Sequence, residues 1–191
     1  MSIPQRHIDG RASDLSRRLC DIVLEQIAVD RRQEPQSLEV SQVNLYRVSA
    51  EVFALRAFTR SKGGNLWTNI RPSNLRILEE HEGIFIGIAF DPAVSREIVI
   101  YHISPNLLKR HLEVGRVPLS DYGQWSLHIR PEGKHAIRLN CGAHLDVVEA
   151  NGINRFERRE LTGREYDAIL GLLREEAGVR QANEDENAVD L

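Results

Sequence analysis

The longest stretch of unopposed charge in the chain lies between positions 52 and 78, which contain no Asp or Glu. A turn at 62–65 carries two glycines, whose lack of a side chain lets backbone N–H groups approach a phosphate closely. The tryptophan of this stretch could stack on a base or a sugar. The segment therefore predicts a nucleic-acid contact; a hairpin with a solvated basic face and a buried tryptophan is the alternative. The candidate residues are Arg56, Arg60, Lys62, Trp67 and Arg71.

A second group with ligand chemistry is His128, His135, Cys141 and His144. If the turn between them centres on Glu132-Gly133, His128 pairs with Ile137 and both His side chains of the hairpin share one face. Cys and His three residues apart are compatible with shared ligation of one ion. The overall spacing matches no zinc signature, so structural or surface roles are the alternative, and no metal site is predicted.

Several catalytic motifs are absent from the sequence. It contains no Gly-x-Ser-x-Gly elbow, no Walker-type phosphate loop, no dinucleotide-binding glycine pattern and no His-Glu-x-x-His helix. His102 alternates within an apolar segment, which is typical of a hydrogen-bonded core residue rather than of a base.

Hydrophobic spacing predicts the elements that must position these residues. Helices are expected over 14–32, from Pro72, from Pro105, and from a Thr162/Glu165 capping box to Gly178. Strands are expected over 37–49 with one bulge, 51–59, 65–70, 84–90 and 98–103, and a hairpin over 124–130 and 135–141. The segments 84–90 and 98–103 are continuously apolar, so they should form the centre of the sheet.

This order predicts an α+β fold, with a central mixed sheet of about five strands flanked by helices, a C-terminal β-hairpin and a closing helix. We expect one globular domain over 1–178, with 120–178 as a possible C-terminal subdomain. Residues 179–191 hold four acidic residues and one Arg, a net charge of −3 (1 − 4), and should form a disordered tail.

Composition excludes several classes of protein. The 191 residues are 41% hydrophobic and 28% charged, with a mean hydropathy of −0.36, and no apolar run approaches the roughly 20 residues of a bilayer span. With no apolar leader and two cysteines, a cytoplasmic protein without a membrane partner is expected. Without the tail, 24 basic (25 − 1) and 24 acidic (28 − 4) residues balance, so nucleic-acid binding needs a local patch.

The element order over roughly residues 14–104 resembles the common core of the PD-(D/E)xK nucleases, the restriction-endonuclease-like fold. In that family the central strand carries an acid or Gln, any residue, and then Lys, because a carboxylate holds Mg²⁺ while the Lys orients water. The matching positions here are Ala54 and Arg56. The resemblance therefore implies a noncatalytic member, or a nuclease with acids relocated to Glu39, Glu51 or Asp91, in which case Mg²⁺ is the cofactor.

We accordingly expect a noncatalytic or weakly catalytic nucleic-acid-associated domain, with DNA or RNA as partner. The alternative is a protein-interaction module, such as a bacterial defence-system accessory, an inhibitor or an immunity-type protein, whose acidic tail contacts a basic partner. A metal-dependent enzyme is a third possibility. No other cofactor is expected.

Overall fold

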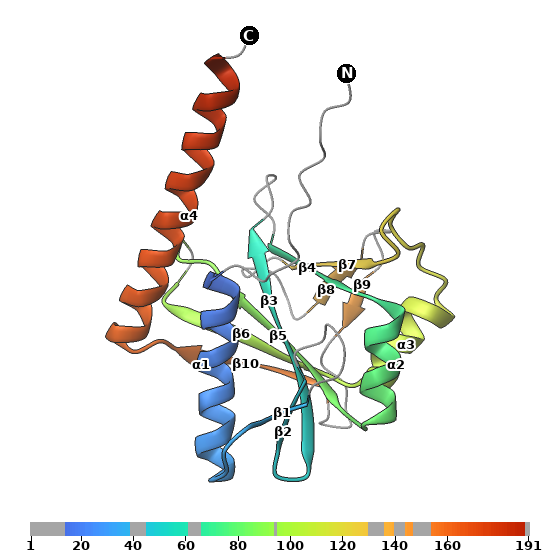
Figure 1. The fold of residues 1–191 in the computed structure, drawn as a ribbon. Coiled ribbons are helices and arrows are strands. Elements are labelled where there is room, and N and C mark those ends of the chain that lie inside the picture. Colours follow the sequence, from blue (N-terminus) through green and yellow to red (C-terminus); the bar gives the residue numbers. More distant parts are fainter. Residues whose placement is uncertain are drawn as a thin grey trace.

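A mixed β-sheet with helices on both faces forms the framework of the protein (Figure 1). The computed structural model describes residues 14–38, 45–60, 66–93, 95–129, 136–139, 144–146 and 154–189. The predicted α+β class, with a mixed sheet between helices, is confirmed. The helices are α1 (Asp14–Arg31), α2 (Pro72–Glu80), α3 (Pro105–Lys109), which continues as a π-helical turn at Arg110–Val114, and α4 (Gly163–Val189).

The strands join into one hydrogen-bonded path, β10-β6-β5-β3-β4-β7-β8-β9, with the β1–β2 pair attached to β3. Only β3 and β5 pair in parallel; every other described pair is antiparallel. The strand bounds are β1 (Gln36–Leu38), β2 (Leu45–Val48), β3 (Glu51–Arg60), β4 (Leu66–Ile70), β5 (Ile84–Phe90), β6 (Glu97–Ile103), β7 (Trp125–Ile129), β8 (Ala136–Leu139), β9 (His144–Asp146) and β10 (Arg155–Glu160).

Two apolar clusters lie on the two faces of the sheet. One face packs against α1 and α4, at the left of Figure 1, and the other against α2 and α3, at the right. Strand β5 alternates between them, since Phe85 and Ala89 belong to the α2 cluster while Ile86 and Ile88 belong to the α1 cluster. Coverage of both faces explains why β5 and β6 are apolar at nearly every position.

Gly87 lies at the middle of β5, between Arg56 of β3 and Tyr101 of β6. A Cβ atom there would be 2.6 Å from Cε2 of Phe58. The absent side chain lets the rings of Phe58 and Tyr101 meet edge to face across β5, with centroids 6.1 Å apart. Glycine is therefore needed at this position for close packing.

The predicted helix starts are confirmed by their hydrogen bonds. Ser104 Oγ accepts from the backbone N–H of Leu107 at 3.2 Å. Thr162 Oγ1 accepts from the N–H of Glu165 at 3.3 Å, and the Glu165 carboxylate accepts from the N–H of Thr162 at 2.9 Å. The predicted end of α4 at Gly178 is not observed, because the helical backbone continues to Val189, through most of the acidic tail.

Two further predictions need correction. The single strand predicted over 37–49 is wrong, because β1 and β2 are separate strands that pair antiparallel, with Leu38 opposite Leu45. The last strand, β10, was not predicted, since its sequence Arg-Phe-Glu-Arg-Arg-Glu has only one apolar residue. No helix in the described ranges is both long enough and apolar enough to cross a bilayer.

Candidate nucleic-acid interface

Strands β4 and β7 present a polar face on the side of the sheet opposite the α2 cluster. Alternation directs Leu66, Ile70, Trp125 and Leu127 into that cluster. The intervening positions are half-buried, and the register places them in cross-strand pairs. We call the following set the polar face: Trp67 opposite His128, Asn69 opposite Ser126, and Arg71 and Gln124 just beyond the strand ends.

Hydrogen bonds along the polar face hold its side chains in place. Ser126 Oγ donates to Oδ1 of Asn69 at 3.0 Å. In the amide orientation that satisfies both side chains, Oε1 of Gln124 accepts from Nε and Nη2 of Arg71, at 3.0 Å each. This two-point contact fixes the plane of the Arg71 guanidinium, and Arg71 is an exposed residue. The face is thus preorganised for an anionic group.

Strand β7 is also held by a hydrogen bond on its other face, which packs into the α2 cluster. The buried Trp125 ring donates from Nε1 to the carbonyl of Val117 at 2.9 Å, and both residues belong to the α2 cluster. The side chains that alternate with Trp125 are therefore displayed on a rigid strand. Trp67 is half-buried and is not among the described members of either apolar cluster.

Arg56 contributes a second cation close to this region. Its side chain is half-buried, and burial lowers the pKa of its guanidinium, which the Cys20 thiol partly offsets and the nearby charge of Arg71 lowers further. The two Arg side chains therefore lie within electrostatic range of each other. Burial also raises the pKa of Cys20 to about 12, so its thiol is unreactive.

Of the two remaining residues predicted to contact nucleic acid, the structure describes only the backbone of one. The backbone of Arg60 pairs with Leu66 at the end of β3, and Lys62 lies outside the described residues. Arg71 thus lies at the end of the polar face, four positions along the chain from Trp67, and its charge acts on Arg56. Asn69, Gln124 and Ser126 were missed by the sequence interpretation, because their role depends on the pairing of two strands that are far apart in sequence.

The predicted His/Cys group does not assemble as expected. His128 pairs with Arg138, not with Ile137, and Arg138 also pairs with His144 of β9. A shift of one residue exchanges the faces of a strand, so the register on which the convergence depended is wrong. His135 and Cys141 lie outside the described residues. In the described ranges, no three His, Cys, Asp or Glu residues are grouped so that they could hold a metal ion.

The acids considered for a relocated metal site are also separated. Glu51 begins β3 and Asp91 follows the end of β5, and because these strands run parallel the two carboxylates lie at opposite edges of the sheet. Asp91 Oδ1 accepts from the N–H of Ala93 at 3.0 Å, which is a turn contact. Glu39 lies outside the described residues.

A separate cavity lies on the α1 side of the sheet. Glu51 lines it together with residues that the sequence analysis did not predict to form a site. Glu157 hydrogen-bonds His102 there, which confirms His102 as a buried, hydrogen-bonded residue.

Comparison of the sequence with protein families and with curated proteins gives no relative. The chain matches no protein-family model, and no curated protein matches it significantly in sequence. The resemblance to the PD-(D/E)xK core thus stays a prediction.

Proposed function

We propose that this protein binds single-stranded nucleic acid, DNA or RNA, across the polar face of β4 and β7, without cleaving it. The observation that carries the proposal is the register of these strands, which sets Trp67 directly opposite His128, with Asn69 and Ser126 next along the face and Arg71 held at its end. Exposed bases stack on aromatic side chains, and cations beside such a platform contact the phosphates.

A single strand suits this face better than a duplex. Sheet surfaces bind nucleic acid when the bases are unpaired and can splay out over side chains that stand perpendicular to the strands. Trp67 and His128 stand on neighbouring strands, about 5 Å apart at Cβ, so successive bases can contact them in turn. Asn69 and Ser126 add polar groups for base edges or sugars along the same face.

We propose a noncatalytic role because β3, the strand that corresponds to the central strand of the PD-(D/E)xK core, lacks the residue types that catalysis needs. The position that carries an acid in the PD-(D/E)xK nucleases is Ala54, which is buried and has no ligand atom. The Lys position is Arg56, whose guanidinium stays protonated and cannot act as a base.

Fluorescence anisotropy with labelled single-stranded DNA, single-stranded RNA and duplex DNA tests the proposal across a salt series. We expect Trp67→Ala to weaken single-strand binding by roughly 5- to 100-fold, the range for loss of one stacked base. Trp67→Phe should restore most of the affinity. Arg71→Gln should reduce the salt slope by about 0.7, which corresponds to one phosphate contact on a single strand.

A variant away from the polar face serves as the control. Arg174 of α4 is exposed, and Arg174→Gln should leave binding unchanged. Equal effects of the test and control variants would place the interface elsewhere. Absence of binding by the unaltered protein at low salt would favour a protein partner, and cleavage in the presence of Mg²⁺ would contradict a noncatalytic role.

A further inference from the structure

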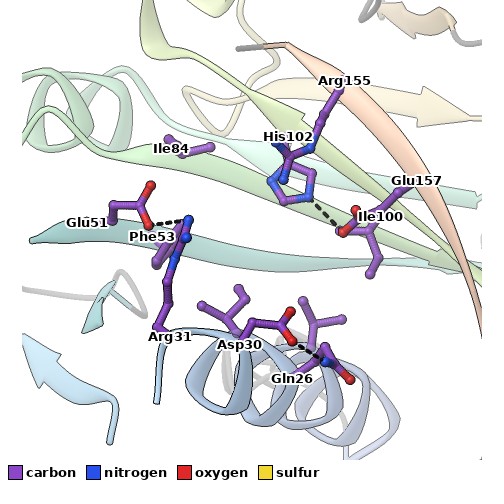
Figure 2. A pocket seen from close by; sticks show the side chains of 12 residues that line it. Gln26, Asp30, Arg31, Glu51, Phe53, Ile84, Ile100, His102, Arg155 and Glu157 are labelled. Carbon is purple, nitrogen blue, oxygen red and sulfur yellow. Dashed lines mark hydrogen bonds and ion pairs between the residues drawn. The ribbon is translucent and has the colours of Figure 1, made fainter. Parts of the chain in front are cut away.

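A cavity of about 410 Å³ lies between α1 and the sheet, at the edge where β3 and β5 begin (Figure 2). Its volume is in the range of sites for small molecules. Apolar side chains line it from both sides, Phe53, Ile84 and Ile100 of the sheet and Val23 and Ile27 of α1. Polar side chains lie among them on α1, β3, β6 and β10. The cavity is therefore amphipathic.

Four of the five charged side chains that line the cavity have a hydrogen-bond or ion-pair partner. Nη2 of Arg31 is 2.6 Å from Oε2 of Glu51, and Nε2 of Gln26 donates to Oδ1 of Asp30 at 2.8 Å. Among the described residues, Arg155 is the charged lining group with no hydrogen-bond or ion-pair partner. Asp30 and Glu157 contact only neutral side chains in the described ranges, so the lining holds three carboxylates against two guanidiniums. A negative charge on a ligand is therefore favourable only on the group that lies against Arg155.

His102 supplies a complementary acceptor next to that cation. Its Nε2 is 3.0 Å from Oε1 of Glu157, and because an ionised carboxylate can only accept, the proton of the neutral ring is on Nε2. Nδ1 is then an unprotonated acceptor, and Figure 2 shows this nitrogen turned away from Glu157, toward the side of the cavity where Glu51 lies. Burial lowers the pKa of His102, Arg155 lowers it as well, and Glu157 and Glu51 oppose the shift.

The strand register brings the acceptor and the cation together. Arg155 of β10 pairs directly with His102 of β6, so their Cβ atoms are about 5 Å apart on one face. Glu157, two residues further along β10, is the diagonal neighbour that orients the ring. A guanidinium fork and a ring nitrogen at this separation can hold two adjacent polar groups of one small molecule.

We propose that this cavity binds a small organic acid with a hydroxyl group next to its carboxylate and an apolar side chain, an α-hydroxy acid. The carboxylate accepts from the guanidinium of Arg155, the hydroxyl donates to Nδ1 of His102, and the side chain packs on Phe53, Ile84 and Ile100. This site is independent of the polar face of β4 and β7.

Isothermal titration with 3-phenyllactate tests the proposal, with 3-phenylpropanoate and 3-phenyllactamide as analogues that lack the hydroxyl and the charge. We expect saturable binding of 3-phenyllactate, and roughly 3- to 10-fold weaker binding of 3-phenylpropanoate, the worth of one hydrogen bond. The uncharged amide should bind at least about 10-fold more weakly than the acid.

Variants of the two key residues should remove one preference each. Arg155→Gln, at an exposed position that tolerates change, should abolish the preference for the acid over the amide. His102→Phe should abolish only the preference for the hydroxyl, with circular dichroism as the check on folding. Arg158→Gln, on the same strand but outside the cavity wall, should change neither preference.

Failure of 3-phenyllactate to bind at millimolar concentration would overturn the proposal. Equal affinity for all three compounds, or an unchanged acid preference in Arg155→Gln, would also overturn it.

Discussion

Replacement of Gly87 by Ala should destabilise the protein because the new methyl group has no room. The added Cβ would lie 2.6 Å from Cε2 of Phe58 and 3.3 Å from Cε1 of Phe85, against about 3.5–4.0 Å for an unstrained contact. Phe58 is 1% and Phe85 2% exposed, so neither ring can move into solvent.

The expected cost follows from three contributions. Overpacking of a core position destabilises by about 1–3 kcal/mol, and part of the edge-to-face contact between Phe58 and Tyr101 is lost, which is worth about 0.5–1.5 kcal/mol. Removing a glycine from a strand offsets about 0.5–1 kcal/mol of this cost. We expect a net loss of about 2 kcal/mol in the free energy of unfolding, and a fall in Tm of about 4–8 °C.

Urea unfolding followed by circular dichroism measures this loss, which should appear as a lower midpoint at an unchanged m value. The same substitution in a Phe58→Leu background should be nearly neutral, because Leu lacks the ring atoms that the methyl group would meet. Gly171→Ala is the matched control, since its Cβ would meet no atom within 4 Å in the middle of α4, and it should stabilise by about 0.5–1 kcal/mol. An equal cost of Gly87→Ala with and without the Phe58 ring would refute the reasoning.

Three further predictions concern local interactions. Thr162→Ala removes the N-cap acceptor of α4 and should lower the free energy of unfolding by about 1 kcal/mol, measurable in urea; Thr162→Ser should restore it. In a Cys141→Ser background, Cys20 should react with a thiol reagent about 1,000-fold more slowly than an ordinary thiol, because its pKa is about 12 instead of 9.0, and an unfolded sample that reacts no faster would contradict this. Because the pKa of folded His102 is below its usual 6.5, the unfolded chain binds more protons, so stability should fall as the pH drops below 6.5. His102→Gln should flatten this dependence in unfolding measurements between pH 7 and pH 5, and an unchanged slope would refute it.

Features that depend on neighbouring residues were predictable from the sequence. The capping box of Thr162 and Glu165 and the N-cap at Ser104 need only residues a few positions apart. The continuous apolar character of 84–90 likewise indicated a strand covered on both faces, which is where β5 lies. Such patterns can be identified from the sequence because the residues that form them are close together in the chain.

Features that depend on distant pairing were not predictable. The polar face exists because Asn69 meets Ser126, 57 positions later, and the cavity because His102 meets Glu157, 55 positions later. Many sheet orders bury the same apolar residues, so alternation cannot select the partner of a strand. The predicted pairing of His128 with Ile137 was wrong by one residue because turn geometry, rather than side-chain pattern, sets the register of a hairpin.

The late position of β10 in the chain has a consequence for biosynthesis. Until residues 155–160 leave the ribosome, β6 is without its outer neighbour and its apolar segment, Ile98–Ile103, has an open edge that could pair with another chain. Once β10 docks, the outermost strand among those described carries five charged residues out of six, a composition that discourages edge-to-edge association. A chain truncated before residue 155 should therefore aggregate during synthesis, while the completed chain protects its own edge.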